Sequence, residues 1–181
     1  MIDIFNSLEK EVDKGIIGGN NGISLGLPGL DRYISIRKRI YTLIFGSSGT
    51  GKSSLANCLY ILNPFDWYWK NRHNTKIKLK IVYFSMERSS VYVTAKWLVR
   101  KIFLNEGVLI PLPKLMGWWD TKLTKDEHDL FLRYRPYFSN MEDIVEIIDG
   151  GTNPTGIYKW IKNYAAKNGR IEKISEFNQI Y

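Results

Sequence analysis

The chain has 181 residues, a formal net charge of +8 and a hydrophobic fraction of 44%. This composition excludes an intrinsically disordered chain, and the length is sufficient for one domain with a buried core. The single cysteine, Cys58, excludes an internal disulfide, and one cysteine with two histidines provides no zinc framework.

The excess of basic residues favours a polyanionic partner such as nucleic acid. The alternative is a solvated basic surface, together with lysines that serve a bound nucleotide. The sequence contains no stretch of about 18 apolar residues for a membrane helix, and residues 1–5 lack the features of a signal peptide. With the low cysteine content, these patterns predict a cytoplasmic protein with no membrane partner.

Residues 2–14 are predicted to form a short amphipathic helix. Its apolar side consists of Ile4, Phe5, Leu8 and Val12. This helix either docks onto a partner or packs on its own domain, and the pattern does not decide between the two. Residues 15–22 are rich in glycine and predict a flexible joint. We therefore predict a linker helix and joint at 1–21 and a core at 22–181.

Residues 46–53 read Gly-Ser-Ser-Gly-Thr-Gly-Lys-Ser and match the pattern G-x-x-x-x-G-K-[ST] of a phosphate-binding loop. The apolar run at 40–45 predicts a buried strand before the loop. Apolar residues at helical spacing predict a helix over 54–62. This order of strand, loop and helix is the one in which the motif binds phosphate. The alternative is a surface turn rich in glycine and serine that happens to precede a lysine.

The residue types in this loop suit a magnesium-bound triphosphate. Glycines allow the backbone to turn sharply and to bring its N–H groups close to the phosphates. The ammonium of Lys52 is expected between the β- and γ-phosphates, and the hydroxyl of Ser53 is expected to bind Mg²⁺. The predicted ATP-binding residues are Gly46, Ser47, Ser48, Gly49, Thr50, Gly51, Lys52, Ser53 and Ser54.

The remainder of the chain alternates between strand and helix patterns. Strands are predicted at 76–85 and 144–149 and helices at 89–103, 124–134 and 156–167. Residues 65–76 are expected to form a surface excursion before the next strand, and residues 107–123 a loop. The helix at 124–134 opens with a capping box, and Asn153 caps the helix at 156–167. Alternating strands and helices predict an α/β fold with a parallel sheet.

Three segments in this order resemble the RecA-type ATPases, above all the DnaB-like replicative helicases. Residues 22–32, Gly-Ile-Ser-Leu-Gly-Leu-Pro-Gly-Leu-Asp-Arg, resemble the segment that precedes the phosphate loop in that group. Residues 83–87, Tyr-Phe-Ser-Met-Glu, resemble its F-F-S-L-E-M-S stretch, and residues 147–154 resemble one of its strand ends. The departures around the loop and the added segment at 65–76 are typical of phage-encoded helicases.

The resemblance implies a P-loop NTPase fold, with a RecA-like parallel sheet flanked by helices and preceded by a short linker helix. It also implies that the core is incomplete at its C-terminal end. Glu87 would be the catalytic carboxylate that activates the attacking water, acting with Lys52. Asp149 either holds Mg²⁺ or ends the strand before the metal-holding one, in which case the true aspartate lies beyond Tyr181.

By this resemblance, the chain is expected to be the ATP-hydrolysing core of a DNA helicase that moves along single-stranded DNA in a homo-hexamer. A primase or a loader is a further expected partner, and the location is the host cytoplasm if the protein is viral. Three alternatives remain open. The first is a recombinase-like or KaiC-type ATP switch without unwinding activity. The second is a DNA-packaging motor, although the strand after its phosphate loop would not be expected to end in Ser-Met-Glu. The third is a nucleotide-binding scaffold.

Overall fold

The structure is a computed structural model. It describes residues 4–37, 40–75, 77–150 and 153–169, together with the backbone of the strands at 171–174 and 177–180. Contacts divide the chain into two compact units, residues 1–64 with 152–181 and residues 65–151, and each unit is described by itself. In the described part of the chain, no helix has the length and apolar character needed to cross a membrane.

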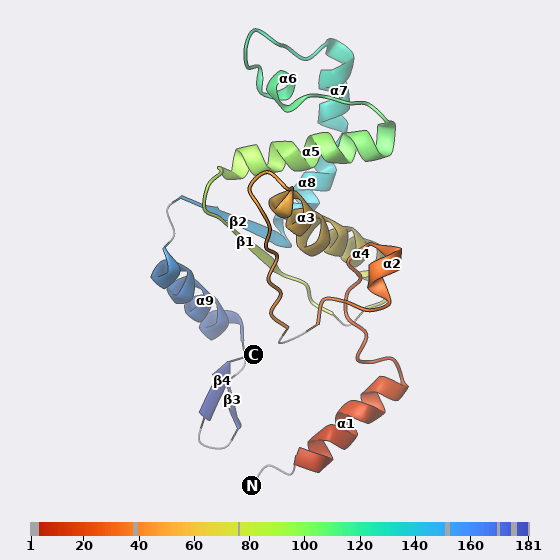
Figure 1. Cartoon of the computed structure of the whole chain (residues 1–181), viewed down its shortest axis with the longest axis vertical. Coiled ribbons are helices and arrows are strands. Elements are labelled where there is room, and N and C mark those ends of the chain that lie inside the picture. The colour runs from red at the N-terminus through yellow and green to blue at the C-terminus, as the bar shows by residue number, and fades with distance from the viewer. Residues whose placement is uncertain are drawn as a thin grey trace. The chain divides into compact units, whose positions relative to one another are not determined.

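The first unit begins with helix α1 (Ile4–Ile16), which confirms the predicted amphipathic helix (Figure 1). None of its residues is buried, and its apolar side, including Leu8 and Val12, is exposed. Whether α1 docks onto a partner therefore stays a prediction.

The segment after the glycine joint is held by Asp31 at the end of the short helix α2 (Pro28–Asp31). One carboxylate oxygen of Asp31 accepts a hydrogen bond from the Ser24 hydroxyl at 2.8 Å, and the other accepts one from the Leu25 backbone N–H at 2.6 Å. The Leu25 carbonyl in turn accepts a hydrogen bond from the Asn63 side-chain amide at 2.6 Å. These contacts fix the segment that leads toward the phosphate loop.

The helix after the loop is longer than predicted. It starts as α3 (Lys52–Asn57), continues without a break as the π-helix η1 (Cys58–Leu62) and ends as α4 (Asn63–Asn71). The segment at 65–76, expected as a surface excursion, therefore begins as a continuation of this helix, up to Asn71. Proline normally breaks a helix because it lacks an N–H group and its ring clashes with a carbonyl of the preceding turn. The wider π turn before Pro64 accommodates this residue, so the chain remains helical.

The second unit contains a parallel pair of strands, β1 (Ile81–Ser85) and β2 (Val145–Asp149). Their register runs from Ile81 opposite Val145 to Ser85 opposite Asp149. Both strands were predicted, although β1 is shorter than the predicted 76–85. Helix α5 (Ser90–Glu106) contacts β2 and confirms the helix predicted at 89–103 (Figure 1).

Three further helices complete the second unit: α6 (Leu112–Met116), α7 (Lys125–Arg133) and α8 (Arg135–Glu142). The capping box at the start of α7 is formed as predicted, between Thr124 and Glu127. Lys114 binds Glu127 at 2.6 Å and, with the cap, lowers the pKa of that carboxyl. A buried core joins α5 to this part of the chain and consists of Leu98 and Ile102 of α5, Ile110, Leu130 of α7 and Tyr134.

The first unit also includes the C-terminal elements. Helix α9 (Pro154–Asn168) is capped by the Asn153 side chain, as predicted. The strands β3 (Ile171–Ile174) and β4 (Phe177–Ile180) pair antiparallel. This hairpin was not predicted.

The predicted RecA-like parallel sheet is wrong. Within the described residues, the strands form one two-stranded parallel sheet and one two-stranded antiparallel sheet, whereas a RecA-like core needs a larger sheet of several parallel strands. The segment at 40–45, predicted as a buried strand, forms no strand at all. Tyr41 and Phe45 are each 86% exposed. An extended segment becomes a strand only when a neighbouring strand takes up its backbone N–H and C=O groups, and 40–45 pairs with no other described segment.

Candidate phosphate-binding site

The phosphate loop forms the turn between the extended segment at 40–45 and helix α3, in the first unit. Residues 46–51 are exposed, Lys52 is half-buried, and Ser53 and Ser54 are exposed. Most of the loop is therefore exposed to solvent.

Two glycines give the loop its shape. Gly49 has a φ of 79° and Gly51 a φ of 86°, and both values lie in the left-handed region that side chains rarely adopt. A Cβ atom placed on either residue would meet no other heavy atom within 4 Å. Glycine is therefore required here by the backbone conformation and not by crowding.

The carbonyl oxygen of Ser47 accepts two hydrogen bonds. The Lys52 ammonium donates one at 2.5 Å, and the Thr50 hydroxyl donates the other at 2.8 Å. Both donors lie further along the chain, so the bonds curl the loop back on itself. They also place the positive charge of Lys52 against the loop backbone, where an anion bound by the loop would meet it.

Helix α3 begins directly at the loop. Its N-cap residue is Gly51, which has no side chain to satisfy the N–H groups of the first turn. Those N–H groups, at Lys52, Ser53 and Ser54, carry the positive end of the helix dipole. Uncapped N–H groups next to an ammonium group form an arrangement suited to phosphate oxygens.

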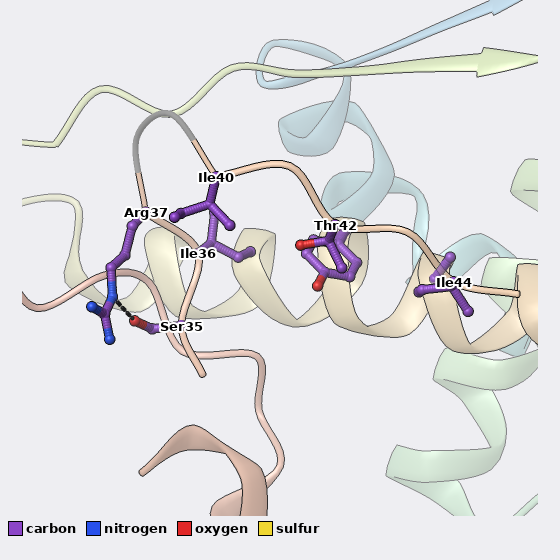
Figure 2. A pocket seen from close by; sticks show the side chains of 8 residues that line it. Ser35, Ile36, Arg37, Ile40, Thr42 and Ile44 are labelled. Atoms are coloured by element: carbon purple, nitrogen blue, oxygen red, sulfur yellow. Dashed lines mark hydrogen bonds between the residues drawn. The ribbon is translucent and has the colours of Figure 1, made fainter. Parts of the chain in front are cut away.

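A cavity of about 400 Å³ lies beside the segment that leads into the loop (Figure 2). It is lined by Ser35, Ile36, Arg37, Ile40, Thr42, Ile44, Ala56 and Tyr60. Figure 2 shows the extended segment running along the helix that follows the loop. Alternate residues of this segment, Ile40, Thr42 and Ile44, line the cavity, so the segment packs only loosely against that helix. None of the predicted ATP-binding residues lines it.

The predicted catalytic carboxylate, Glu87, lies in the second unit. It follows β1 by two residues and is exposed. Among the described residues, its carboxylate has no hydrogen-bond or ion-pair partner. The turn around it is held by Ser85, whose hydroxyl donates to the Arg88 carbonyl at 2.6 Å. The catalytic role of Glu87 stays a prediction.

Asp149 lies at the same edge of the sheet, because the parallel strands place it opposite Ser85. Its carboxylate accepts the backbone N–H of Ser90, in the first turn of α5. This hydrogen bond lowers the pKa of the Asp149 carboxyl. Asp149 thus accepts a backbone N–H group at the start of α5, a contact that the sequence alone does not predict.

The described residues contain no group of three or more His, Cys, Asp or Glu side chains that could hold a metal ion. A phosphate loop needs no such group, because Mg²⁺ is bound there largely by phosphate oxygens and water together with one hydroxyl. Ser53, exposed at the start of α3, is the residue that fits this role.

Comparison of the chain with protein-family models, with curated proteins and with solved structures finds no match.

Proposed function

We propose that the chain binds ATP with Mg²⁺ at the phosphate loop and hydrolyses it. The observation that carries the proposal is the conjunction of Gly49 and Gly51 in left-handed conformation with Lys52 folded over the loop at an uncapped helix start. A serine-rich surface turn needs none of these features. Backbone N–H groups would bind the phosphates, and the ammonium of Lys52 would neutralise part of their charge.

Binding would rearrange one contact. The Lys52 ammonium is bonded to the Ser47 carbonyl, and it would exchange this neutral acceptor for phosphate oxygens. A hydrogen bond between two charged groups is stronger than one to a neutral carbonyl. This exchange favours the bound state and makes affinity depend on the lysine charge.

Replacement of Lys52 by alanine tests this proposal. We expect Lys52→Ala to weaken the binding of a fluorescent ATP analogue by about 10- to 100-fold, because a charge-assisted hydrogen bond contributes about 1.5–3 kcal/mol. The control is Lys10→Ala, which removes an exposed lysine from α1. Far-ultraviolet circular dichroism checks that both variants keep their helices. Equal affinity in the parent and in Lys52→Ala would contradict the proposal.

The order of motifs in the sequence extends the proposal to a DnaB-like helicase, with hydrolysis coupled to movement on single-stranded DNA in a homo-hexamer. The two-stranded sheet gives this extension no support, so it depends on the resemblance alone. Strand separation by the full chain in the presence of ATP tests it, and sedimentation with and without ATP tests the ring. Hydrolysis without unwinding would favour an ATP switch, and binding without hydrolysis would favour a scaffold.

A further inference from the structure

Three aromatic rings form a continuous series on the second unit, which we call the aromatic ladder: Tyr92 of α5, and Trp118 and Trp119 of the loop after α6. Tyr92 and Trp118 are stacked, with centroids 6.3 Å apart and planes 17° apart. Trp118 and Trp119 follow edge to face at 6.2 Å. Trp119 is 80% exposed and Trp118 is 38% exposed. The outer end of the ladder therefore offers a large ring to solvent.

The turn that carries Trp119 has an uncommon backbone. Both central residues, Trp119 and Asp120, have positive φ angles, of 53° and 55°, as in a type I′ turn. Such turns normally contain asparagine and glycine, because a bulky residue is strained in this region. The Trp118 carbonyl closes the turn by accepting both the N–H and the hydroxyl of Thr121, at 3.1 and 2.6 Å. In this turn the Trp119 side chain is left 80% exposed.

Two cations flank the inner end of the ladder. The Arg88 guanidinium lies 4.9 Å from the centroid of the Tyr92 ring, and the Lys96 ammonium lies 6.0 Å from it. Both side chains belong to exposed residues. Glu87 and Asp120 are the acidic residues next to this surface in sequence. Cationic groups beside exposed rings are the combination that binds nucleic acid strands, because phosphates need cations and unpaired bases need ring faces.

We propose that the aromatic ladder, with Arg88 and Lys96, is a binding site for single-stranded nucleic acid. Bases would stack on Trp119 and Trp118, and phosphates would contact the two cations. A duplex hides the faces of its bases, so the same surface favours a single strand. The two cations beside Tyr92 give the surface a positive charge, which complements the phosphates of a strand. The proposed helicase activity already needs a single strand, and this inference names the surface that would hold it. It does not depend on ATP binding.

The test is the binding of a fluorescein-labelled oligothymidylate of about 20 nucleotides, long enough for an extended single-strand site. Fluorescence anisotropy with the full chain, in the absence of ATP and ADP, gives the dissociation constant of the oligonucleotide. We expect Trp119→Ala to weaken binding roughly 10-fold, because the loss of one stacked base is of this size. Trp119→Phe keeps a ring and should stay within about threefold of the parent.

A matched control is Tyr33→Ala. Tyr33 is also exposed and also has a guanidinium over its ring, that of Arg32 at 5.2 Å, but no aromatic ring is stacked on it among the described residues. This variant should bind as the parent does. The slope of the logarithm of the oligonucleotide binding constant against the logarithm of salt concentration should be smaller by roughly 0.7 in Arg88→Gln. This is the change expected when one phosphate contact to a single strand is lost.

Four results would overturn the proposal. The first is that Trp119→Ala and Tyr33→Ala weaken oligonucleotide binding equally, and the second is that Trp119→Phe binds as weakly as Trp119→Ala. The third is that the chain binds a duplex as tightly as a single strand, and the fourth is that it binds no oligonucleotide at low salt. The last result would leave the surface to a protein partner. Lys52→Ala should leave oligonucleotide affinity unchanged without nucleotide, so failure of the ATP proposal and failure of this one are told apart.

Discussion

The hydroxyl of Tyr137 donates a hydrogen bond of 2.8 Å to a carboxylate oxygen of Asp66, although the two residues are 71 positions apart in the sequence. The other carboxylate oxygen of Asp66 pairs with the Lys101 ammonium, also at 2.8 Å. The same ammonium lies 4.5 Å from the centre of the Tyr137 ring. The three residues belong to α4, α5 and α8. This cluster therefore ties together three helices of the second unit.

Loss of the Tyr137 hydroxyl is expected to destabilise the second unit. In Tyr137→Phe the ring remains packed against Phe65, whose ring centroid lies 5.3 Å away, but Asp66 loses one hydrogen bond. A hydrogen bond to a charged group contributes about 1.5–3 kcal/mol, so we expect a decrease of that order in the free energy of unfolding. Urea denaturation measures it. The control is Tyr158→Phe at an exposed position of α9, which should change stability little.

Because of Tyr137, we also expect a loss of stability at alkaline pH. Burial and the nearby Asp66 carboxylate raise the pKa of Tyr137 above its ordinary value of 10.0. The unfolded chain then releases the phenol proton near pH 10 while the folded chain keeps it, so the free energy of unfolding falls as the pH rises above about 10. Denaturation between about pH 8 and pH 11 should show a steeper loss in the parent than in Tyr137→Phe. Identical slopes would contradict this prediction.

Because of Asp149, we expect the free energy of unfolding to fall at acid pH, in contrast to the alkaline loss that Tyr137 causes. The Ser90 N–H holds its pKa below the ordinary 3.8, so its contribution is present above that value and is lost as the pH falls through the folded pKa. Asp149→Asn should flatten the acid limb of the stability curve. The same variant should leave Mg²⁺-dependent ATP affinity unchanged if the residue only caps α5. A large loss of that affinity would instead assign Mg²⁺ binding to Asp149.

Several elements could be predicted because their signals are local. The capping box of Thr124 and Glu127 marks the start of α7 within four residues of sequence, and Asn153 marks the start of α9 in the same way. The phosphate loop belongs to this class, since its glycines determine its backbone.

Features that depend on distant partners were missed. The run at 40–45 has the composition of a strand, yet strand formation needs a neighbour that the run itself does not specify. The π turn before Pro64 and the cluster of Asp66 with Tyr137 are likewise set by packing. The aromatic ladder had one local signal in the sequence, which is the pair of adjacent tryptophans, Trp118 and Trp119, in a segment expected to be a loop.

The role of Glu87 in hydrolysis gives a separate prediction. We expect Glu87→Gln to bind ATP as the parent does and to lose about 100-fold or more of its turnover, the usual contribution of a general base. Phosphate release measures turnover. Glu142→Gln, at another exposed glutamate of the same unit, is the control. Unchanged turnover in Glu87→Gln would remove this residue from the mechanism.

The most direct test of the central claim is calorimetric titration of the intact chain with ATP, first with Mg²⁺ and then with the metal chelated. We predict saturable binding at one site, with a dissociation constant well below about 1 mM, weakened by chelation. ADP should bind at the same loop through its remaining phosphates. Absence of any uptake of ATP or ADP at millimolar concentrations would contradict the claim that residues 46–53 form a nucleotide site.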